Sequence, residues 1–463
     1  MQTPRFQNVL LLLASYAVYA YLDARMLWLL VAATLVSFAV GWGTQRLQAH
    51  GAERAAGILT TAGVSAAVGL LVAFKYLDFF AEGIVASMQS MGLNVSWTAL
   101  HLVLPVGLSF YSFKLISYMV EVRRERILAE RDFVAFAAYV AFFPTILAGP
   151  IDRPQHFLPQ LHQSRALRWE NLVSGAKMIL WGAFMKVCVA DILSPVTDMA
   201  WDAGGERLAL WAFLMYPMQM YADFSGYSLM AIGVAKTLGF DVACNFRQPF
   251  MARNVAEYWR RWHMSLTTWV TDYVFMPLSL RWRDAGRWGL AAAVTVNLVV
   301  IGMWHGDSVT YLLFGLYHAM LFMPLVFGGT FGRNKKLRTA RWGLPAATES
   351  MKMARTYLLV AVGFVIFRAP NAVAVWAFLC RLFTPALPMQ PAPGGSRWFY
   401  LVVIFGALLT EYFMRNASSP LHFKGNGLMQ RRWARWAVYY VLLAFLYICA
   451  DTGAATQFIY TQF

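Results

Sequence analysis

The sequence predicts an all-α polytopic membrane protein, and three observations support this fold class. Of the 463 residues, 59% are hydrophobic and only 13% are charged, whereas soluble domains carry about 25% charged residues. Many apolar stretches approach the ~20 residues that a membrane-spanning helix needs. These stretches are too long and too uniformly apolar for the alternating segments of a membrane β-barrel, which are about 10 residues long.

The candidate spanning segments follow one another along the whole chain. We expect roughly 10–13 membrane helices, allowing for merged or re-entrant pieces. The first apolar run lacks a small-residue cleavage site, which favours an uncleaved first span over a removable signal. The apolar runs lie near 8–22, 26–42, 57–76, 101–120, 132–149, 171–190, 207–235, 288–305, 309–328, 356–368, 398–414 and 435–451.

The net charge of +16 comes largely from basic residues in the links between apolar runs. The positive-inside rule produces this distribution, so we place these links in the cytoplasm. We expect them to contact anionic lipid rather than nucleic acid. A further link, 384–397, is rich in Pro and Gly and is typical of an exposed loop. The basic links contain Arg123, Arg124, Arg126 and Arg131; Arg333, Lys335, Lys336, Arg338 and Arg341; and Lys424, Arg431, Arg432 and Arg435.

Residues 1–463 are predicted to form a single integral membrane domain, because no soluble domain or internal repeat interrupts the apolar pattern. The sequence lacks a P-loop, a dinucleotide-binding Gly-rich fingerprint and an HExxH motif, so the usual signals of three common chemistries are missing. The cysteines are far apart and show no metal-ligand spacing or disulfide framework. We therefore expect no metal site and mostly buried, apolar cysteines. The cysteines are Cys188, Cys244, Cys380 and Cys449.

The segment 253–266, RNVAEYWRRWHMSL, differs from the apolar runs because it is amphipathic at helical spacing. Such a helix suits the membrane interface, with charges among the headgroups and tryptophans against acyl chains. An anchoring helix without any chemistry is equally compatible with the pattern. The two faces are Arg253, Glu257, Arg260 and Arg261 on one side and Val255, Trp259, Trp262 and Leu266 on the other.

Several ionisable residues stand in or beside the apolar runs, where a charge is costly and usually marks a function or a water-filled cavity. We expect Lys114 and Lys177 to snorkel towards the membrane surface. Lys186 and Asp191 have suitable charges for an ion pair. Asp223 lies in YADFSGYS, a polar break that favours close helix packing over catalysis.

The stretch MWHGDSVTYLLFGLYH places His305 between Trp304 and Gly306, which indicates a helix end or kink. Histidine titrates near neutrality and can take or give a proton. His318 would lie about 220° around and roughly 20 Å along one continuous helix, so it is interpreted as a packed core histidine. His263 is free to approach His305 through folding. Composition alone leaves a transporter and a membrane enzyme equally open.

Five motifs in order carry a resemblance that covers nearly the whole chain. Together they resemble the membrane-bound O-acyltransferase superfamily. Two branches fit: the alginate O-acetyltransferases and the D-alanyl-lipoteichoic acid transferases. The motifs are LPVGLSFYSFKLISYMVEV (104–122), FFPTILAGPIDR (142–153), DFSGYSLMAIG (223–233), NFRQPFMARNVAEYWRRWHMSLTTWVTDYVFMPL (245–278) and MWHGDSVTYLLFGLYHA (303–319).

The resemblance implies a helical bundle in the bacterial inner membrane with a central tunnel or opposed funnels. It implies no bound cofactor but a cytoplasmic thioester substrate, either acetyl-CoA or a phosphopantetheine carrier protein. The expected product is an O-acetylated exported polysaccharide, made with an extracytoplasmic acyl-relay or polysaccharide-modifying partner. D-alanyl transfer towards teichoic acid or another envelope polymer is the alternative within the class. A transporter or scaffold without chemistry is the alternative outside it.

The resemblance also implies that His305 is the catalytic histidine and His263 the second histidine of the site. An alcohol attacks a thioester poorly until its proton is removed, so His305 would act as a general base, which contributes about 10²–10⁴ in rate. His263 would stabilise the developing oxyanion or orient the donor. The supporting residues expected around them are Trp304, Gly306, Asp307, Asp223, Ser225, Tyr227, Asn254, Trp259, Arg261, Trp262 and Ser265.

Overall fold

The computed structural model describes most of the chain, and the part it describes is helical. It contains no β-strand in that part, only an isolated bridge between Thr339 and Pro345, so the predicted all-α class is confirmed. The chain divides into unit 1, Met1–Leu172 with Ala235–Ala243, and unit 2, Val173–Val234 with Cys244–Phe463. A single membrane domain over the whole chain stays a prediction. The described residues are 3–96, 104–201, 208–332, 339, 344–383, 397–415, 421–422 and 431–450.

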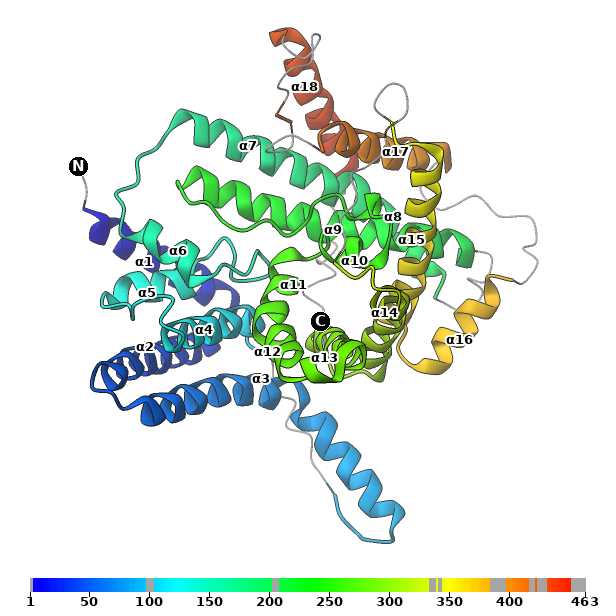
Figure 1. Cartoon of the computed structure of the whole chain (residues 1–463). Helices are drawn as coiled ribbons and strands as arrows, with labels where there is room; N and C mark the ends of the chain where they lie inside the picture. Colours follow the sequence, from blue (N-terminus) through cyan, green and yellow to red (C-terminus); the bar gives the residue numbers. More distant parts are fainter. Residues whose placement is uncertain are drawn as a thin grey trace. The chain divides into compact units, whose positions relative to one another are not determined.

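Unit 1 is built on two sets of packed helices. Its helices are α1 (Pro4–Asp23), α2 (Leu27–Ala49), α3 (Glu53–Ser90), α4 (Leu108–Arg123), α5 (Phe133–Val140) and α6 (Pro154–Leu161). α2, α3 and α4 pack against one another, and α1 packs against α5 (Figure 1). Thr3 caps the start of α1, where its hydroxyl accepts the N–H of Phe6, and so supplies one of the acceptors that a helix N-terminus lacks.

Lys114 in α4 is buried inside unit 1, with 1% of its surface exposed. Its ammonium donates to the carbonyl oxygens of Tyr139 at 3.1 Å and Val140 at 3.5 Å, and to Oγ1 of Thr145 at 3.3 Å. The two carbonyls close the C-terminal turn of α5, where a cation is stabilised by the helix dipole. The expectation that Lys114 snorkels is therefore wrong, because oxygen atoms within the unit satisfy its charge.

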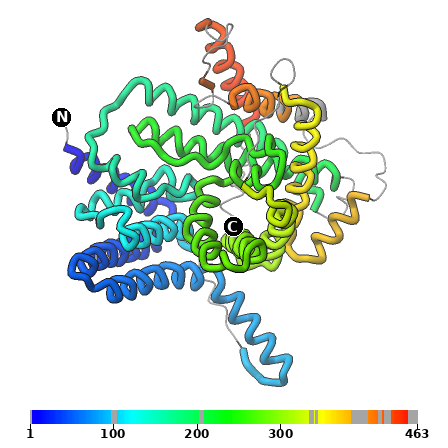
Figure 2. Tube along the Cα trace, in the orientation of Figure 1, coloured from blue at the N-terminus to red at the C-terminus, as the bar shows by residue number. Residues whose placement is uncertain are grey.

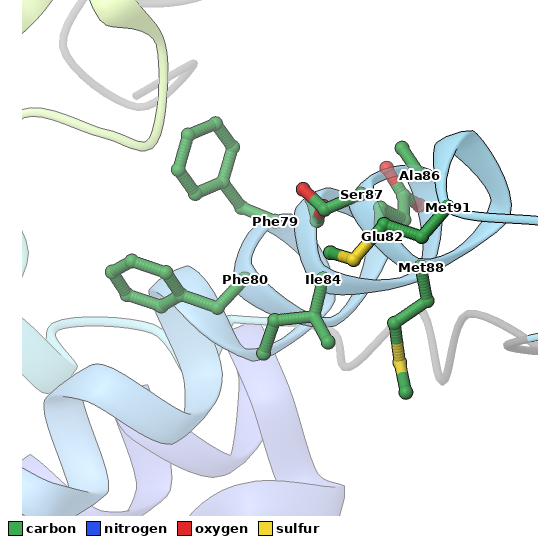
Figure 3. A pocket seen from close by; sticks show the side chains of 9 residues that line it. Phe79, Phe80, Glu82, Ile84, Ala86, Ser87, Met88 and Met91 are labelled. Atoms are coloured by element: carbon green, nitrogen blue, oxygen red, sulfur yellow. The ribbon is translucent and has the colours of Figure 1, made fainter.

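The second half of α3 projects away from α2 and α4 (Figure 2). Its surface carries a shallow, mostly apolar groove, whose lining includes Phe80 and Ile84, 49% and 60% exposed. Figure 3 shows that the lining side chains belong to this one helix and its end. Exposed apolar side chains on a spanning helix are suited to contact with acyl chains, so we interpret the groove as a lipid-facing surface.

Unit 2 contains the remaining helices. They are α7 (Trp169–Phe184), α8 (Asp191–Met199), α9 (Ala209–Thr237), α10 (Val255–Trp259), α11 (Met264–Val270), α12 (Met276–Arg281), α13 (Gly286–Trp304), α14 (Val309–Phe327), α15 (Ala347–Arg368), α16 (Ala372–Arg381), α17 (Arg397–Phe413) and α18 (Arg432–Cys449). α7 begins in unit 1, and α9 ends there. α13 and α14 form an antiparallel hairpin, and α15 packs against α14 (Figure 1).

Small residues bring the helices of unit 2 into backbone contact. A Cβ atom at Gly302 would lie only 2.3 Å from the carbonyl oxygen of Tyr311. The absence of a side chain at Gly302 therefore lets α13 and α14 pack closely in the hairpin. A Cβ at Gly226 would lie 2.6 Å from the carbonyl oxygen of Gly182, so α7 and α9 meet at the polar break around Asp223. Close packing through small residues is a common way for membrane helices to associate, and it confirms the interpretation of that break as a packing feature.

Six segments of the described chain are long and apolar enough to cross a membrane, fewer than the 10–13 helices expected. Part of the shortfall is the run 132–149, which forms only the eight residues of α5 before the chain turns. α9 has 29 residues, but polar residues such as Asp223 lower its hydropathy. The six segments are Pro4–Ala49, Glu53–Ser90, Trp169–Met199, Arg283–Trp304, Val309–Phe327 and Ala347–Arg368.

The amphipathic segment 253–266 does not form one continuous helix. It divides into α10 and α11, because His263 between them has a left-handed backbone conformation with φ of 42°. Trp259 and Trp262 are buried within the protein, whereas Arg260 is exposed. An interfacial position for this segment stays a prediction.

Some predicted features fall on residues that the structure does not describe, and one expectation, for the cysteines, is partly wrong. The Pro- and Gly-rich link 384–397 lies outside them except for its last residue, as do the basic residues of 333–341 and Lys424. Cys188 is buried as expected, but Cys244 and Cys380 are exposed, so the expectation of buried cysteines is wrong for these two.

Candidate active site

The tip of the α13–α14 hairpin carries His305, and it forms as the sequence predicted. α13 ends at Trp304, His305 caps it, and α14 begins after Ser308, whose Oγ accepts the N–H of Thr310. A Cβ at Gly306 would lie 2.7 Å from the ring of Tyr311. Glycine therefore allows the backbone of the turn to approach that ring closely.

Aromatic rings surround the imidazole of His305, which is 8% exposed. Its centroid lies 4.9 Å from that of Trp304 and 4.8 Å from that of Phe367 on α15, both in edge-to-face contacts. Tyr311, one turn into α14, lies 6.1 Å away. Edge-to-face ring contacts are favourable at these separations, so three helices hold the imidazole at the hairpin tip.

His263 reaches the same tryptophan from a distant part of the sequence. Its ring is 1% exposed and makes edge-to-face contacts with Phe224 of α9 at 4.8 Å and with Trp304 at 5.7 Å. Trp304 thus contacts both His263 and His305. The structure brings together the two histidines that the sequence singled out, with one indole ring in contact with each.

The environment of His263 sets its protonation state. The residue lies outside the six spanning segments, and burial lowers its pKa to about 3. Its imidazole is therefore neutral at pH 7, with one nitrogen carrying a proton and the other accepting. A neutral imidazole of this kind can donate a single hydrogen bond to a substrate oxygen.

An ion-pair network holds the chain that leads to His263. Asn254 caps α10 through a 2.8 Å bond from the N–H of Glu257. Glu257 pairs with Arg253 and Arg261, each at 2.9 Å, and Arg253 also reaches Glu349 of α15 at 3.0 Å. Burial alone would raise the pKa of Glu257, but the hydrogen bonds and charges of the two arginines outweigh it and lower the pKa. Asn254 and Arg261 therefore act on the conformation of this loop.

Asp223 is buried in a second network of charges. Lys186 lies 2.6 Å from Asp223 and 2.8 Å from Asp191, so the predicted Lys186–Asp191 pair is confirmed and a third residue joins it. Lys186 lies in a π-helical turn, Met185–Ala190, between α7 and α8. The two following polar residues differ: Ser225 is buried, and Tyr227 is half-buried. The paired charge favours a structural role for Asp223.

The structure also places the two predicted tryptophans of the 253–266 segment, and with them His318. Trp259 donates its indole N–H to Nδ1 of His318 at 3.2 Å, and a Cβ at Gly363 would lie 2.6 Å from Nε2 of that histidine. His318 is therefore a packed core histidine, as predicted. Trp262 stacks on Tyr258 at 5.5 Å. Asp307 is exposed in the turn after His305, so any orienting role for it stays a prediction.

Three further polar residues of unit 2 were not among the predicted site residues. Asn245 is buried and bonded to Ser265, and nothing in its local pattern marks it. Glu411 was detectable, because it is an acid within the apolar run 398–414; its two carboxylate oxygens lie 2.7 and 2.8 Å from the hydroxyl of Tyr221. Arg368 follows Phe367 at the end of α15, and its guanidinium lies 5.2 Å from the ring centre of Tyr216.

The fold and the site together define a multi-pass helical membrane protein with a buried histidine at a hairpin tip. The family model of the membrane-bound O-acyltransferases matches residues 122–343, a range that contains both His263 and His305. A probable alginate O-acetylase from Pseudomonas syringae pv. tomato is 35% identical over 371 residues, which are 79% of this chain and 68% of the relative. The chain belongs to the membrane-bound O-acyltransferase family.

Two other relatives are named for different activities. A peptidoglycan O-acetyltransferase from Helicobacter pylori is 30% identical over 356 residues, 69% of this chain and 64% of the relative. A teichoic acid D-alanyltransferase from Bacillus subtilis is 28% identical over 312 residues, 62% of this chain and 77% of the relative. The protein is therefore an O-acyltransferase with several spans in the bacterial inner membrane.

Proposed function

We propose that this enzyme moves an acetyl group from a cytoplasmic thioester across the membrane to a hydroxyl, for O-acetylation of an exported envelope polysaccharide. The observation that carries the proposal is the position of His263 and His305 in contact with the same indole, that of Trp304. The acetyl group is favoured because the alginate O-acetylase relative is more similar to this chain than the D-alanyltransferase relative. Transfer of D-alanine is the second candidate.

The chemistry assigns one task to each histidine. His305 takes the proton of the acceptor hydroxyl as its oxygen attacks the thioester carbonyl. Neutral His263 donates a hydrogen bond to the oxyanion that forms. When the carbon–sulfur bond breaks, protonated His305 returns the proton to the leaving thiolate. The rings of Trp304 and Phe367 exclude water, which would otherwise hydrolyse the thioester.

The distribution of basic residues supports an acceptor side near His305. Arg281, Arg283 and Arg287 lie around the start of α13, and the positive-inside rule places them in the cytoplasm. α13 then leads away from the cytoplasm, and His305 follows its last residue. The donor, acetyl-CoA or a carrier-protein thioester, would enter from the cytoplasmic side. An acceptor or acyl-relay partner would approach from the opposite side.

The test is transfer of labelled acyl groups in proteoliposomes that contain the purified protein. Labelled acetyl and D-alanyl thioesters are offered separately, with wild type and His305→Ala at matched abundance. We expect acetyl transfer by wild type and almost none by the variant. Undiminished transfer by His305→Ala would remove the proposed mechanism, and transfer of D-alanine alone would favour the second candidate. Movement of an intact solute without a thioester would indicate a transporter.

A further inference from the structure

His263 has a backbone conformation that histidine rarely adopts. Its φ of 42° and ψ of 53° lie in the left-handed region, where the Cβ of an ordinary residue is crowded by the backbone. Such a conformation persists only where surrounding contacts over-determine it, and such positions cluster at functional sites. The conformation also turns the chain between α10 and α11, and this turn directs the imidazole towards Phe224 and Trp304.

Asn245 makes hydrogen bonds to the two residues that follow His263 and to α9. Its backbone carbonyl accepts the N–H of Met264, the residue after His263, at 2.8 Å. Its side-chain Oδ1 accepts from Oγ of Ser265 at 2.5 Å, and its Nδ2 donates to Oγ of Ser228 on α9 at 3.0 Å. One residue therefore connects the start of α11 to α9, the helix that supplies Phe224.

Two hydrogen bonds between Arg247 and Arg261 hold the preceding turn closed. The N–H of Arg247 donates to the carbonyl oxygen of Arg261 at 3.0 Å, and the guanidinium of Arg261 donates back to the carbonyl oxygen of Arg247 at 3.2 Å. These bonds join the two sides of the loop two residues after Asn245 in the sequence. These two bonds join Arg247 to Arg261, whereas the bonds of Asn245 join α9 to the start of α11.

We propose that Asn245 is the positioning residue of His263, and this inference rests on the proposed function of the two histidines. An amide can donate and accept at the same time, which the bonds to Ser228 and Ser265 require. Asn245 is completely buried, and its replacement by alanine removes the hydrogen bonds to Ser228 and Ser265. The left-handed turn then loses its connection to α9, and the imidazole moves relative to Trp304.

The test compares Asn245→Ala with Gln219→Ala in the proteoliposome assay. Gln219 is a matched control, because it is a buried amide on α9, the helix that carries Ser228, and accepts a hydrogen bond from Thr197. We expect Asn245→Ala to lower kcat by about 10²-fold with little change in KM, because a small displacement of a positioned group costs that much. Gln219→Ala is expected to leave kcat per folded molecule unchanged.

A double-mutant cycle separates positioning from a general loss of stability. If Asn245 acts through His263, Asn245→Ala causes no further loss of kcat in a His263→Ala background. Losses that multiply would overturn the inference, and so would an Asn245→Ala enzyme with wild-type kcat. If His263→Ala itself keeps full activity, the inference fails while His305→Ala still tests the proposed reaction. If Asn245→Ala does not fold, Ser228→Ala replaces it in the experiment, because it removes only the hydrogen bond from Nδ2 of Asn245. A wild-type kcat for Ser228→Ala would also overturn the inference.

Discussion

Lys114 in unit 1 and the two histidines of the site in unit 2 are all buried, but they have different neighbours. In unit 1, the ammonium of Lys114 faces three oxygen atoms, two of them carbonyls at the end of α5. In unit 2, His263 and His305 lie against the rings of Phe224, Trp304 and Phe367. Oxygen atoms at hydrogen-bond distance stabilise the buried charge of an ammonium group. Aromatic rings instead exclude water from around an imidazole. Burial alone therefore does not distinguish a structural charge from a reaction site.

Two histidines of one hairpin also differ in their surroundings, although aromatic rings lie against both. His318 accepts a hydrogen bond from Trp259 and packs against Gly363, so its neighbours give it a structural role. His305 lies at the hairpin tip among rings from three helices. Substitutions at these groups can test whether the kind of neighbour, rather than the depth of burial, decides the role of each group.

The largest expected effect is the difference between His305→Ala and His318→Ala. We expect His305→Ala to lower the transfer rate by about 10²–10⁴-fold with little change in stability, because the general base is lost. We expect His318→Ala to cost about 1–3 kcal/mol of stability, because the indole N–H of Trp259 is left buried without an acceptor. The transfer rate per folded molecule and the Tm in detergent measure the two effects. An equal loss of transfer rate in both variants would contradict the assignment of different roles to His305 and His318.

Lys114→Met should destabilise the protein without changing its chemistry. Removing the ammonium leaves the carbonyl oxygens of Tyr139 and Val140 without their donor, at a cost of about 1–3 kcal/mol. Lys177→Met is the matched control, because Lys177 is only half-buried and lies 5.8 Å from the ring centre of Tyr439, a cation–π contact that contributes about 0.5–1 kcal/mol where the cation keeps access to solvent. Thermal unfolding of both variants gives the comparison. A lower kcat per folded molecule for Lys114→Met would place this lysine in the reaction instead.

Two substitutions at His263 should separate its backbone from its ring. Asparagine tolerates the left-handed conformation better than alanine does, so we expect His263→Asn to be more stable than His263→Ala by about 1 kcal/mol. Both variants should lose transfer activity, because alanine has no side-chain donor and the shorter side chain of asparagine places its amide away from the position of the imidazole. Chemical denaturation and the acyl-transfer assay provide the two measurements. Equal stability of the two variants would mean that the turn is not strained.

The smallest expected effect is a pH dependence at His156 in unit 1. Its ring lies 3.4 Å from Asp152 and 3.6 Å from Asp241, and Lys236 approaches Asp241 at 3.8 Å. The hydrogen bond with Asp152 outweighs burial and raises the pKa of His156. Its stabilisation is therefore complete below the ordinary pKa of about 6.5 and is lost as the pH rises through the raised pKa.

A comparison with His156→Gln isolates this contribution. Because His156 is half exposed, we expect wild type to gain only about 0.2–1 kcal/mol over the variant at low pH. Thermal unfolding between about pH 5 and pH 8.5, on either side of the pKa, should show the difference shrinking as the pH rises. A difference that is constant across this range would contradict the assignment of the ion pair.

Local sequence signals predicted a substantial part of the fold and some of the site. The helix break at Trp304–Gly306, the packed role of His318 and the Lys186–Asp191 pair followed from residue types and spacing. The run 132–149 was misjudged because apolar composition does not reveal where the chain turns, and only α5 forms there. The break at His263 was also missed, because the helical periodicity continues across it in the sequence.

The amino-acid sequence by itself determined the class of fold, because apolar segments in a bilayer must satisfy their backbone hydrogen bonds internally and so form helices. It also determined which residues could perform acid–base chemistry. Only the tertiary structure decided which of these residues meet. His263 and His305 are 42 positions apart, and they reach the same indole because Asn245, Ser228 and Ser265 hold a left-handed turn that local preference opposes. Hydrogen bonds between distant segments offset the cost of such a turn, and no local sequence pattern specifies these bonds.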